Sequence, residues 1–259
     1  MIRTELHAVA VPSEHGGWGL TIEPALLGLL VAPSWPGVAL AVAALVAFVA
    51  RTPLKCALVD RWRHRRLPRT VLAEKVAALE IALLVGLVVV AAATASGAFW
   101  VPVLMALPLV AVELWFDMRS RSRRLLPELA GAIGIGGVTA GIVLADRGGS
   151  AFAAALWCIV AARAIASIPF VRVQLCRYKQ QPYRRNASDV AQGLAVVVAG
   201  SAAALDGRML AGLVAIVGLG LFQIWAVRRP APQAGMLGAQ QVVVGLTVVL
   251  VTALGALAP

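Results

Sequence analysis

Charged side chains are scarce in this sequence. Only 14% of its 259 residues are Asp, Glu, Lys or Arg, whereas 61% are hydrophobic, and the mean hydropathy is +0.87. A soluble domain holds about 45–50% apolar residues and has to present polar surface to water. The composition therefore excludes an ordinary soluble domain. It predicts an all-α, polytopic integral membrane helical bundle whose apolar helices are solvated by lipid.

Cysteine is also rare, which bears on metal binding and catalysis. The three cysteines, Cys56, Cys158 and Cys176, show no CxxC or Cys/His spacing, so no metal site is predicted. We expect them to be reduced residues that pack between helices. No combination of nucleophile, base and metal ligand indicates serine, cysteine or zinc catalysis. Whether the protein is an enzyme stays open at this stage.

Long apolar runs dominate the sequence. Nine of them are candidate membrane spans within a single integral membrane domain, 1–259, and they cover residues 17–32, 37–59, 71–94, 100–115, 126–145, 151–171, 190–205, 209–227 and 236–257. The first and fourth are the weakest, so eight to ten spans are compatible with the sequence. The residues before the first run are too polar for a secretory signal, and we expect this run to remain in the mature protein.

The basic residues are distributed unevenly between the loops. The formal net charge is +11, and the connections on the side of the N-terminus hold sixteen Arg and Lys residues, whereas the opposite connections hold only Arg147 and Arg208. Short cytoplasmic loops of membrane proteins carry such an excess. The pattern predicts a cytoplasmic N-terminus and an external C-terminus, and it explains the charge better than binding of nucleic acid would.

Several ionisable side chains lie inside the apolar runs, where each costs about 2.5–3.5 kcal/mol unless it is paired or hydrated. The candidate ligand-binding residues among them are Glu23, Arg51, Lys55, Glu80, Glu113, Arg163 and Arg172. Most of them fall in the cytoplasmic half of their spans, which predicts a polar cavity open to the cytoplasm. Structural ion pairs between helices are the alternative, and Arg172 can also be an interfacial residue.

Two further candidates, Glu14 and His15, precede a glycine-rich helix start. Free amide groups at a helix N-terminus favour anions. An interfacial turn is the alternative interpretation of this segment.

The segments that surround these residues resemble a known family. The runs VPSEHGGWG (11–19), TIEPALLGLLVAPSW (21–35) and ARTPLKCALVDRWRHRRLPRT (50–70) resemble the signature of YwiC-like membrane proteins. The resemblance implies a multispanning protein of the bacterial cytoplasmic (inner or plasma) membrane, without implying a particular reaction.

A more distant similarity in layout is to the UbiA superfamily of intramembrane prenyltransferases. It rests on the nine expected spans, the cytoplasmic N-terminus and the segment MRSRSRRLLPELAG (118–131). That family holds Mg²⁺ with paired aspartates on two helices, whereas the matching regions here keep only Asp60 and are otherwise basic. No cofactor is therefore predicted, although arginine can bind phosphate without a metal.

Three functions fit these features. The first is binding of an anionic lipid or an isoprenoid phosphate in a UbiA-like cavity on which Arg51, Lys55, Arg163 and Arg172 would converge. The second is ion-coupled transport, in which Glu80 would be essential. The third is assembly of a membrane complex with protein partners that the sequence does not identify.

Overall fold

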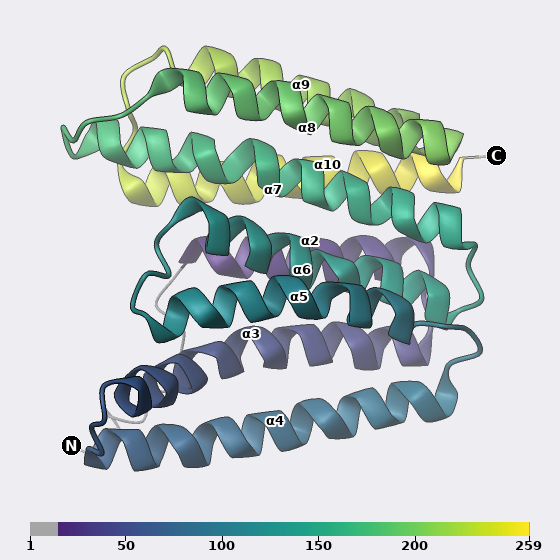
Figure 1. Ribbon diagram of the computed structural model, residues 1–259. Helices are drawn as coiled ribbons and strands as arrows, with labels where there is room; N and C mark the ends of the chain where they lie inside the picture. The colour runs from purple at the N-terminus through teal and green to yellow at the C-terminus, as the bar shows by residue number, and fades with distance from the viewer. Residues whose placement is uncertain (1–14, 259) are drawn as a thin grey trace.

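The computed structural model describes residues 15–258 of the chain, and every regular element in this part is helical. The helices are α2 (His15–Val31), α3 (Trp35–Trp62), α4 (Pro68–Thr94), α5 (Trp100–Met118), α6 (Leu125–Ala145), α7 (Ser150–Tyr178), α8 (Arg185–Leu205), the short 3₁₀ helix η1 (Gly207–Met209), α9 (Leu210–Ala226) and α10 (Ala234–Leu257). Each of the nine predicted runs corresponds to one of the α-helices (Figure 1).

Eight helices of the described part are long and apolar enough to cross a membrane, and α2 is a shorter apolar helix. They run roughly side by side, and their connections gather at two ends of the bundle (Figure 1). The predicted polytopic helical bundle is therefore confirmed. Some helices continue beyond the apolar runs. For example, α7 extends past residue 171 to Tyr178, since long basic side chains can leave the apolar layer while the backbone stays helical.

The two ends of the bundle differ in their loops. One end carries residues 63–67, 119–124, 179–184 and 227–233, all of which include arginine, and we call it the arginine-rich end. The opposite end carries shorter connections, such as 32–34 and 146–149. The helices therefore alternate in direction, as the loop charges predicted.

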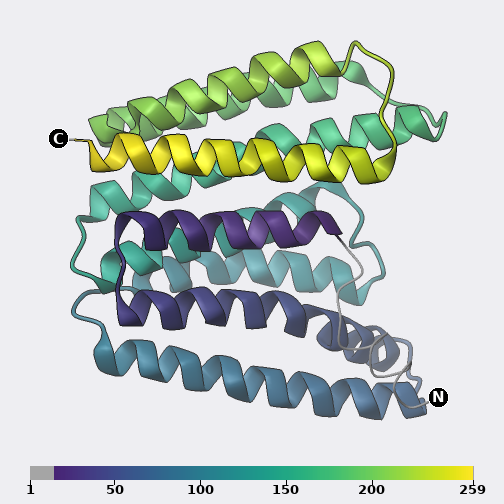
Figure 2. The same cartoon turned by 180° about the vertical axis from the view of Figure 1, so that it is seen from behind.

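The helices form two groups. Helices α2 to α6 make up the N-terminal group, in which α4 packs against α3 at one outer edge, and α7 to α10 make up the C-terminal group, in which α8 and α9 form the other edge. The seam between the groups is formed by α6 against α7 and by α2 against α10, and Figure 2 shows α2 and α10 side by side.

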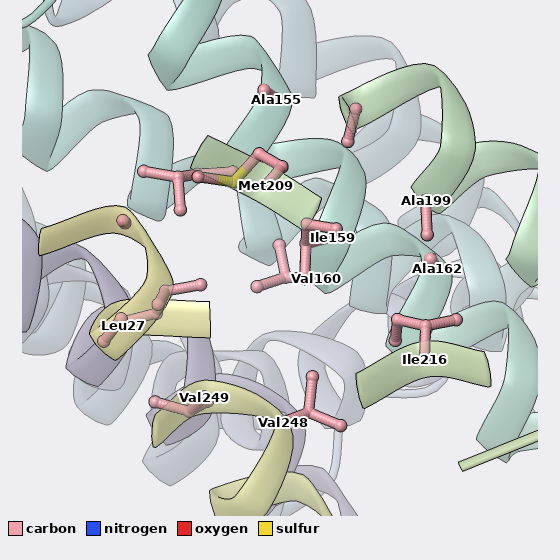
Figure 3. Packing of buried hydrophobic residues seen from close by; sticks show 14 of the residues in the cluster. Leu27, Ala155, Ile159, Val160, Ala162, Ala199, Met209, Ile216, Val248 and Val249 are labelled. Carbon is pink, nitrogen blue, oxygen red and sulfur yellow. The ribbon is translucent and has the colours of Figure 1, made fainter. Parts of the chain in front are cut away.

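An apolar cluster joins the groups at this seam. Leu27 of α2, Ile159 of α7 and Val249 of α10 belong to it, together with Met209 of η1 and Ile216 of α9 (Figure 3). Alanine and glycine supply much of the remaining contact, as they do where membrane helices approach closely. A Cβ added to Gly28 of α2, for example, would lie 2.9 Å from the Ile142 side chain of α6.

Candidate functional site: paired charges and an open arginine pocket

The first group of predicted site residues lies between α3 and α5. Arg51 donates to both carboxylate oxygens of Asp117, at 2.8 and 3.2 Å, and lies 3.0 Å from Glu113. Lys55 donates to the Ser122 hydroxyl at 2.7 Å and lies 3.8 Å from Asp117. The i, i+4 spacing on each helix brings two cations to face two carboxylates, so the charges of this cluster compensate one another.

The second group is the pair formed by Glu23 of α2 and Arg163 of α7. Arg163 Nε and Nη2 lie 3.3 Å from the two Glu23 oxygens, and the side chains are only 6% and 5% exposed. Arg163 also donates to the Gln241 carbonyl at 2.8 Å and to the Ser167 hydroxyl. Gly245 of α10 leaves the room for the carboxylate, because an added Cβ would overlap it. This ion pair crosses the seam between the helix groups.

The third group links α6 and α7 near the arginine-rich end. Arg172 donates to Glu128 at 2.9 Å and to the Arg123 carbonyl at 2.8 Å. Both side chains of the pair are about one-third exposed. This geometry agrees with the interfacial interpretation of Arg172.

The four cations do not converge on one cavity, so this expectation was wrong. Arg51 and Lys55 share Asp117, whereas Arg163 faces Glu23 and Arg172 faces Glu128. The physical reason is that a cation in an apolar bundle is stabilised by the nearest carboxylate, and packing supplied a carboxylate from a different helix in each case.

Glu80 of α4 is the exception among the candidates. Its Oε2 atom is buried, and it has no hydrogen-bond partner among the described residues. The helix packs against α3 at the outer edge of the bundle and leaves large apolar side chains such as Leu79 and Leu83 exposed. Glu80 is thus a carboxyl group in a membrane-spanning helix that no cation neutralises in the described part of the chain.

The two candidates before the first helix cannot be placed in the site. Glu14 lies outside the described residues, and of His15 only the backbone is described, as the first residue of α2. The same limit applies to the proposed anion site at this helix start, which remains a prediction.

Sequence reasoning missed a pocket at the arginine-rich end. It lies between the C-terminal ends of α3 and α5, has a volume of ≈ 430 Å³ and is lined by Trp62, Arg63, Met118, Arg119 and Arg121. No lining residue is acidic. The signal in the sequence was the pair of basic loops, but positive-inside topology already explained these arginines.

Two of the three arginines that line the pocket contact neutral partners. The Arg119 guanidinium lies 4.0 Å from the ring centroid of Trp115 and 5.6 Å from that of Trp62. Arg63 donates to the Ser120 hydroxyl at 3.0 Å. A guanidinium over an indole keeps its full charge, so the pocket presents positive charge that its own walls do not neutralise.

Sequence reasoning also missed buried polar groups in both halves. Asp60 accepts hydrogen bonds from Arg69 and Thr70 between α3 and α4. In the C-terminal group, Gln192 donates to Gln223 at 2.9 Å. The sequence signal for these buried contacts was the presence of neutral glutamines within apolar runs. The prediction considered only the charged residues of these runs.

No three His, Cys, Asp or Glu side chains gather as a metal site within residues 15–258. The cysteines Cys56, Cys158 and Cys176 are free thiols, each of them partly buried. The arrangement of the described residues therefore compensates charge inside the bundle and presents arginines without a carboxylate in the rim pocket.

The chain was compared with known proteins at three levels. Searches of the curated proteins and of the solved structures found no match. A family model described as YwiC-like protein matches residues 11–143, which cover α2 to α5 and most of α6. The match spans just over half of the chain, and it agrees with the resemblance of the first seventy residues. The chain belongs to the YwiC-like protein family.

Proposed function

We propose that this multi-pass membrane protein binds an anionic lipid or an isoprenoid phosphate at its arginine-rich end. The observation that carries the proposal is the pocket lined by Arg63, Arg119, Arg121 and Trp62, which contains no carboxylate. Guanidinium groups bind phosphate through parallel N–H donors, and indole rings favour the interface between lipid and water.

The ion pairs inside the bundle favour this rim site over an interior one. Arg51, Arg163 and Arg172 each have a carboxylate within 3.3 Å, so an anionic ligand among them would first have to displace it. The pocket at the end of α3 and α5 needs no such displacement. We place the arginine-rich end in the cytoplasm, where basic loops accumulate. Binding at the rim pocket does not require the UbiA-like layout, which stays a prediction.

The test compares two triple variants that lose equal charge from the same end. R63Q/R119Q/R121Q removes the pocket arginines, and R65Q/R66Q/R184Q removes exposed arginines that do not line it. The purified proteins are titrated with nanodiscs containing phosphatidylglycerol or only phosphatidylcholine, and separately with a soluble short-chain polyprenyl phosphate.

We expect the pocket triple to lose at least tenfold more affinity for one anionic probe than the control triple, because both triples lose the same general surface charge and only the pocket triple loses guanidinium groups that contact the phosphate directly. Loss with the polyprenyl phosphate alone identifies the isoprenoid ligand, and loss with phosphatidylglycerol identifies the lipid. An equal loss in both triples would reduce the effect to general surface charge and overturn the proposal.

Proton-coupled transport is a second candidate, and Glu80 is the observation that favours it. An isolated carboxylate is too costly in an apolar environment and takes up a proton instead. Dicyclohexylcarbodiimide modifies protonated carboxyl groups in apolar surroundings, and we expect an adduct on Glu80 that E80Q lacks. The control is E74Q on the same helix, since Glu74 pairs with Arg61 at 2.8 Å. Absence of an adduct on Glu80 in the folded protein would exclude this candidate.

A further inference from the structure

A chain of buried hydrogen bonds crosses the C-terminal group of helices. Gln192 of α8 donates to Gln223 of α9 at 2.9 Å, and Gln223 donates to the Ser167 hydroxyl of α7 at 3.1 Å. All three side chains are buried, with exposures of 4% or less. Uncharged polar groups from three helices thus meet within apolar spans.

This chain continues to the ion pair at the seam. Ser167 accepts a hydrogen bond from Arg163, and Arg163 pairs with Glu23 of α2. Beside the pair lies a gap lined by residues of α2, α6, α7 and α10, among them Glu23 and Arg163. Its volume of ≈ 10 Å³ is about the space that one water molecule needs.

The polar chain also reaches the arginine-rich end. Arg163, Ser167, Gln174 and Arg177 follow one another along α7 at spacings that keep them on one side of the helix. Gln174 donates to the Ala226 carbonyl at 3.2 Å, and Arg177 at the rim donates to Gln174 at 2.7 Å. Polar groups of α7 therefore lie on one side of the helix both near the rim, at Gln174 and Arg177, and near the seam, at Arg163 and Ser167, with the buried Phe170 between the two pairs.

Within residues 15–258, four buried atoms along this route have no hydrogen-bond partner: Arg163 Nε, Ser188 Oγ, Gln192 Oε1 and Gln241 Nε2. Of these, Arg163 Nε still faces the Glu23 carboxylate at 3.3 Å. Ser188 is fully buried in the first turn of α8, one turn before Gln192. Opposite Gln192 lies Gly220, where even an added Cβ would stay 3.7 Å from Oε1. An unpaired buried polar atom costs about 1–3 kcal/mol, and buried water is the usual partner of such atoms.

We propose that these polar groups line a hydrated inlet, which leads water molecules from the arginine-rich end to the Glu23–Arg163 pair. Ser188, Gln192 and Gln223 line one side of it, and Ser167 and Gln174 of α7 line the other. A dry network holding the helices together would pair its own atoms, whereas here Ser188 Oγ, Gln192 Oε1 and Gln241 Nε2 stay open. The inlet gives water, and any small polar solute that travels with it, access to a buried charge pair.

Cysteine reactivity tests the inlet. Single variants S188C, Q192C and S167C are made in a background in which the three native cysteines are alanine, and A199C is the matched control. Ala199 is fully buried on the same side of α8, two turns beyond Gln192. The proteins are reacted in nanodiscs with iodoacetamide, a small neutral reagent that attacks the thiolate, and a thiolate forms only where water reaches the sulfur.

We expect S188C and Q192C to react at least tenfold faster than A199C. The rate of S167C should lie between the rates of these two variants and the rate of A199C. Labelling in detergent at denaturing strength confirms that every thiol is intact. Rates of S188C and Q192C within tenfold of A199C would overturn the inlet and leave a dry structural network. If Q192C fails to fold, S188C decides, because Ser to Cys changes a single atom. Lipid binding at the rim pocket is independent of this result.

Discussion

The two helix groups tolerate polar side chains in different ways. Between α3 and α5 of the N-terminal group, full charges face each other, and Arg51, Lys55, Glu113 and Asp117 compensate one another. Between α7, α8 and α9 of the C-terminal group, neutral amides and hydroxyls form the contacts. The groups meet at the Glu23–Arg163 pair.

The difference teaches where a ligand can enter. A charge pair satisfies itself, so the α3–α5 cluster offers little to an anion without losing its own compensation. An amide network has more donors and acceptors than its geometry can pair, which leaves atoms such as Gln192 Oε1 open to small polar molecules. We therefore keep the proposed anion site at the rim apart from the proposed hydrated route inside the bundle.

The largest effect is expected where the groups meet. Arg163→Leu leaves the Glu23 carboxylate buried without its cation, and breaking a buried pair costs about 3–5 kcal/mol. We expect R163L to lose most of its monodisperse protein after extraction in mild detergent. The double variant E23L/R163L removes both charges and should recover a large part of that loss. If the double variant is no more stable than R163L, the unpaired Glu23 carboxylate is not the cause of the loss.

A smaller effect is expected within the amide network. Gln192→Leu removes the donor to Gln223 and to the Ala166 carbonyl. Hydrogen bonds between membrane helices contribute about 0.6 kcal/mol on average and about 1.7 at most, so a modest fall in the Tm measured in detergent should follow. A loss of stability as large as that of R163L would contradict the difference between charged and neutral polar contacts inside the bundle.

The smallest effect is expected at the opposite end of the bundle, where Asp206 and Arg208 form a partly exposed pair at 2.7 Å. The hydrogen bond from Arg208 lowers the pKa of Asp206. A lowered pKa in the folded state stabilises the protein above the ordinary aspartate pKa of about 3.9, and this contribution is lost as the pH falls through the folded value.

Because the pair is exposed, its contribution should stay under about 1 kcal/mol. The Tm difference between wild type and D206N is expected to be small at pH 6 and to vanish as the pH falls below 4. A Tm difference that grew as the pH fell would contradict a stabilising interaction of the ionised Asp206 side chain. The comparison with R163L then measures how much burial amplifies an ion pair.

The positions of the helices followed from the sequence, because each apolar run predicted one helix. Ion pairs between helices were one of the two interpretations of the charged residues in these runs, and Arg51 pairs with Glu113 and Asp117. The convergence of four cations was wrong, since nothing local to Arg163 or Arg172 indicates which carboxylate will lie beside it.

The arginine pocket, too, could not be predicted from the sequence. Arg63 and Arg119 belong to different loops, and each has an ordinary explanation as a basic residue near a membrane surface. Their meeting around Trp62 depends on how the ends of α3 and α5 pack.

The sequence by itself determined that the chain is a bundle of apolar helices with one basic end. The length of an apolar run and the charge of a loop are local properties, and their effect depends only on the lipid or water around them. Only the tertiary structure decided which polar groups meet. Glu23 and Arg163 are 140 residues apart, and the seam that joins them is formed by helix packing between small residues. Residues so far apart along the chain produce no periodic pattern in the sequence, because the packing of whole helices brings them together.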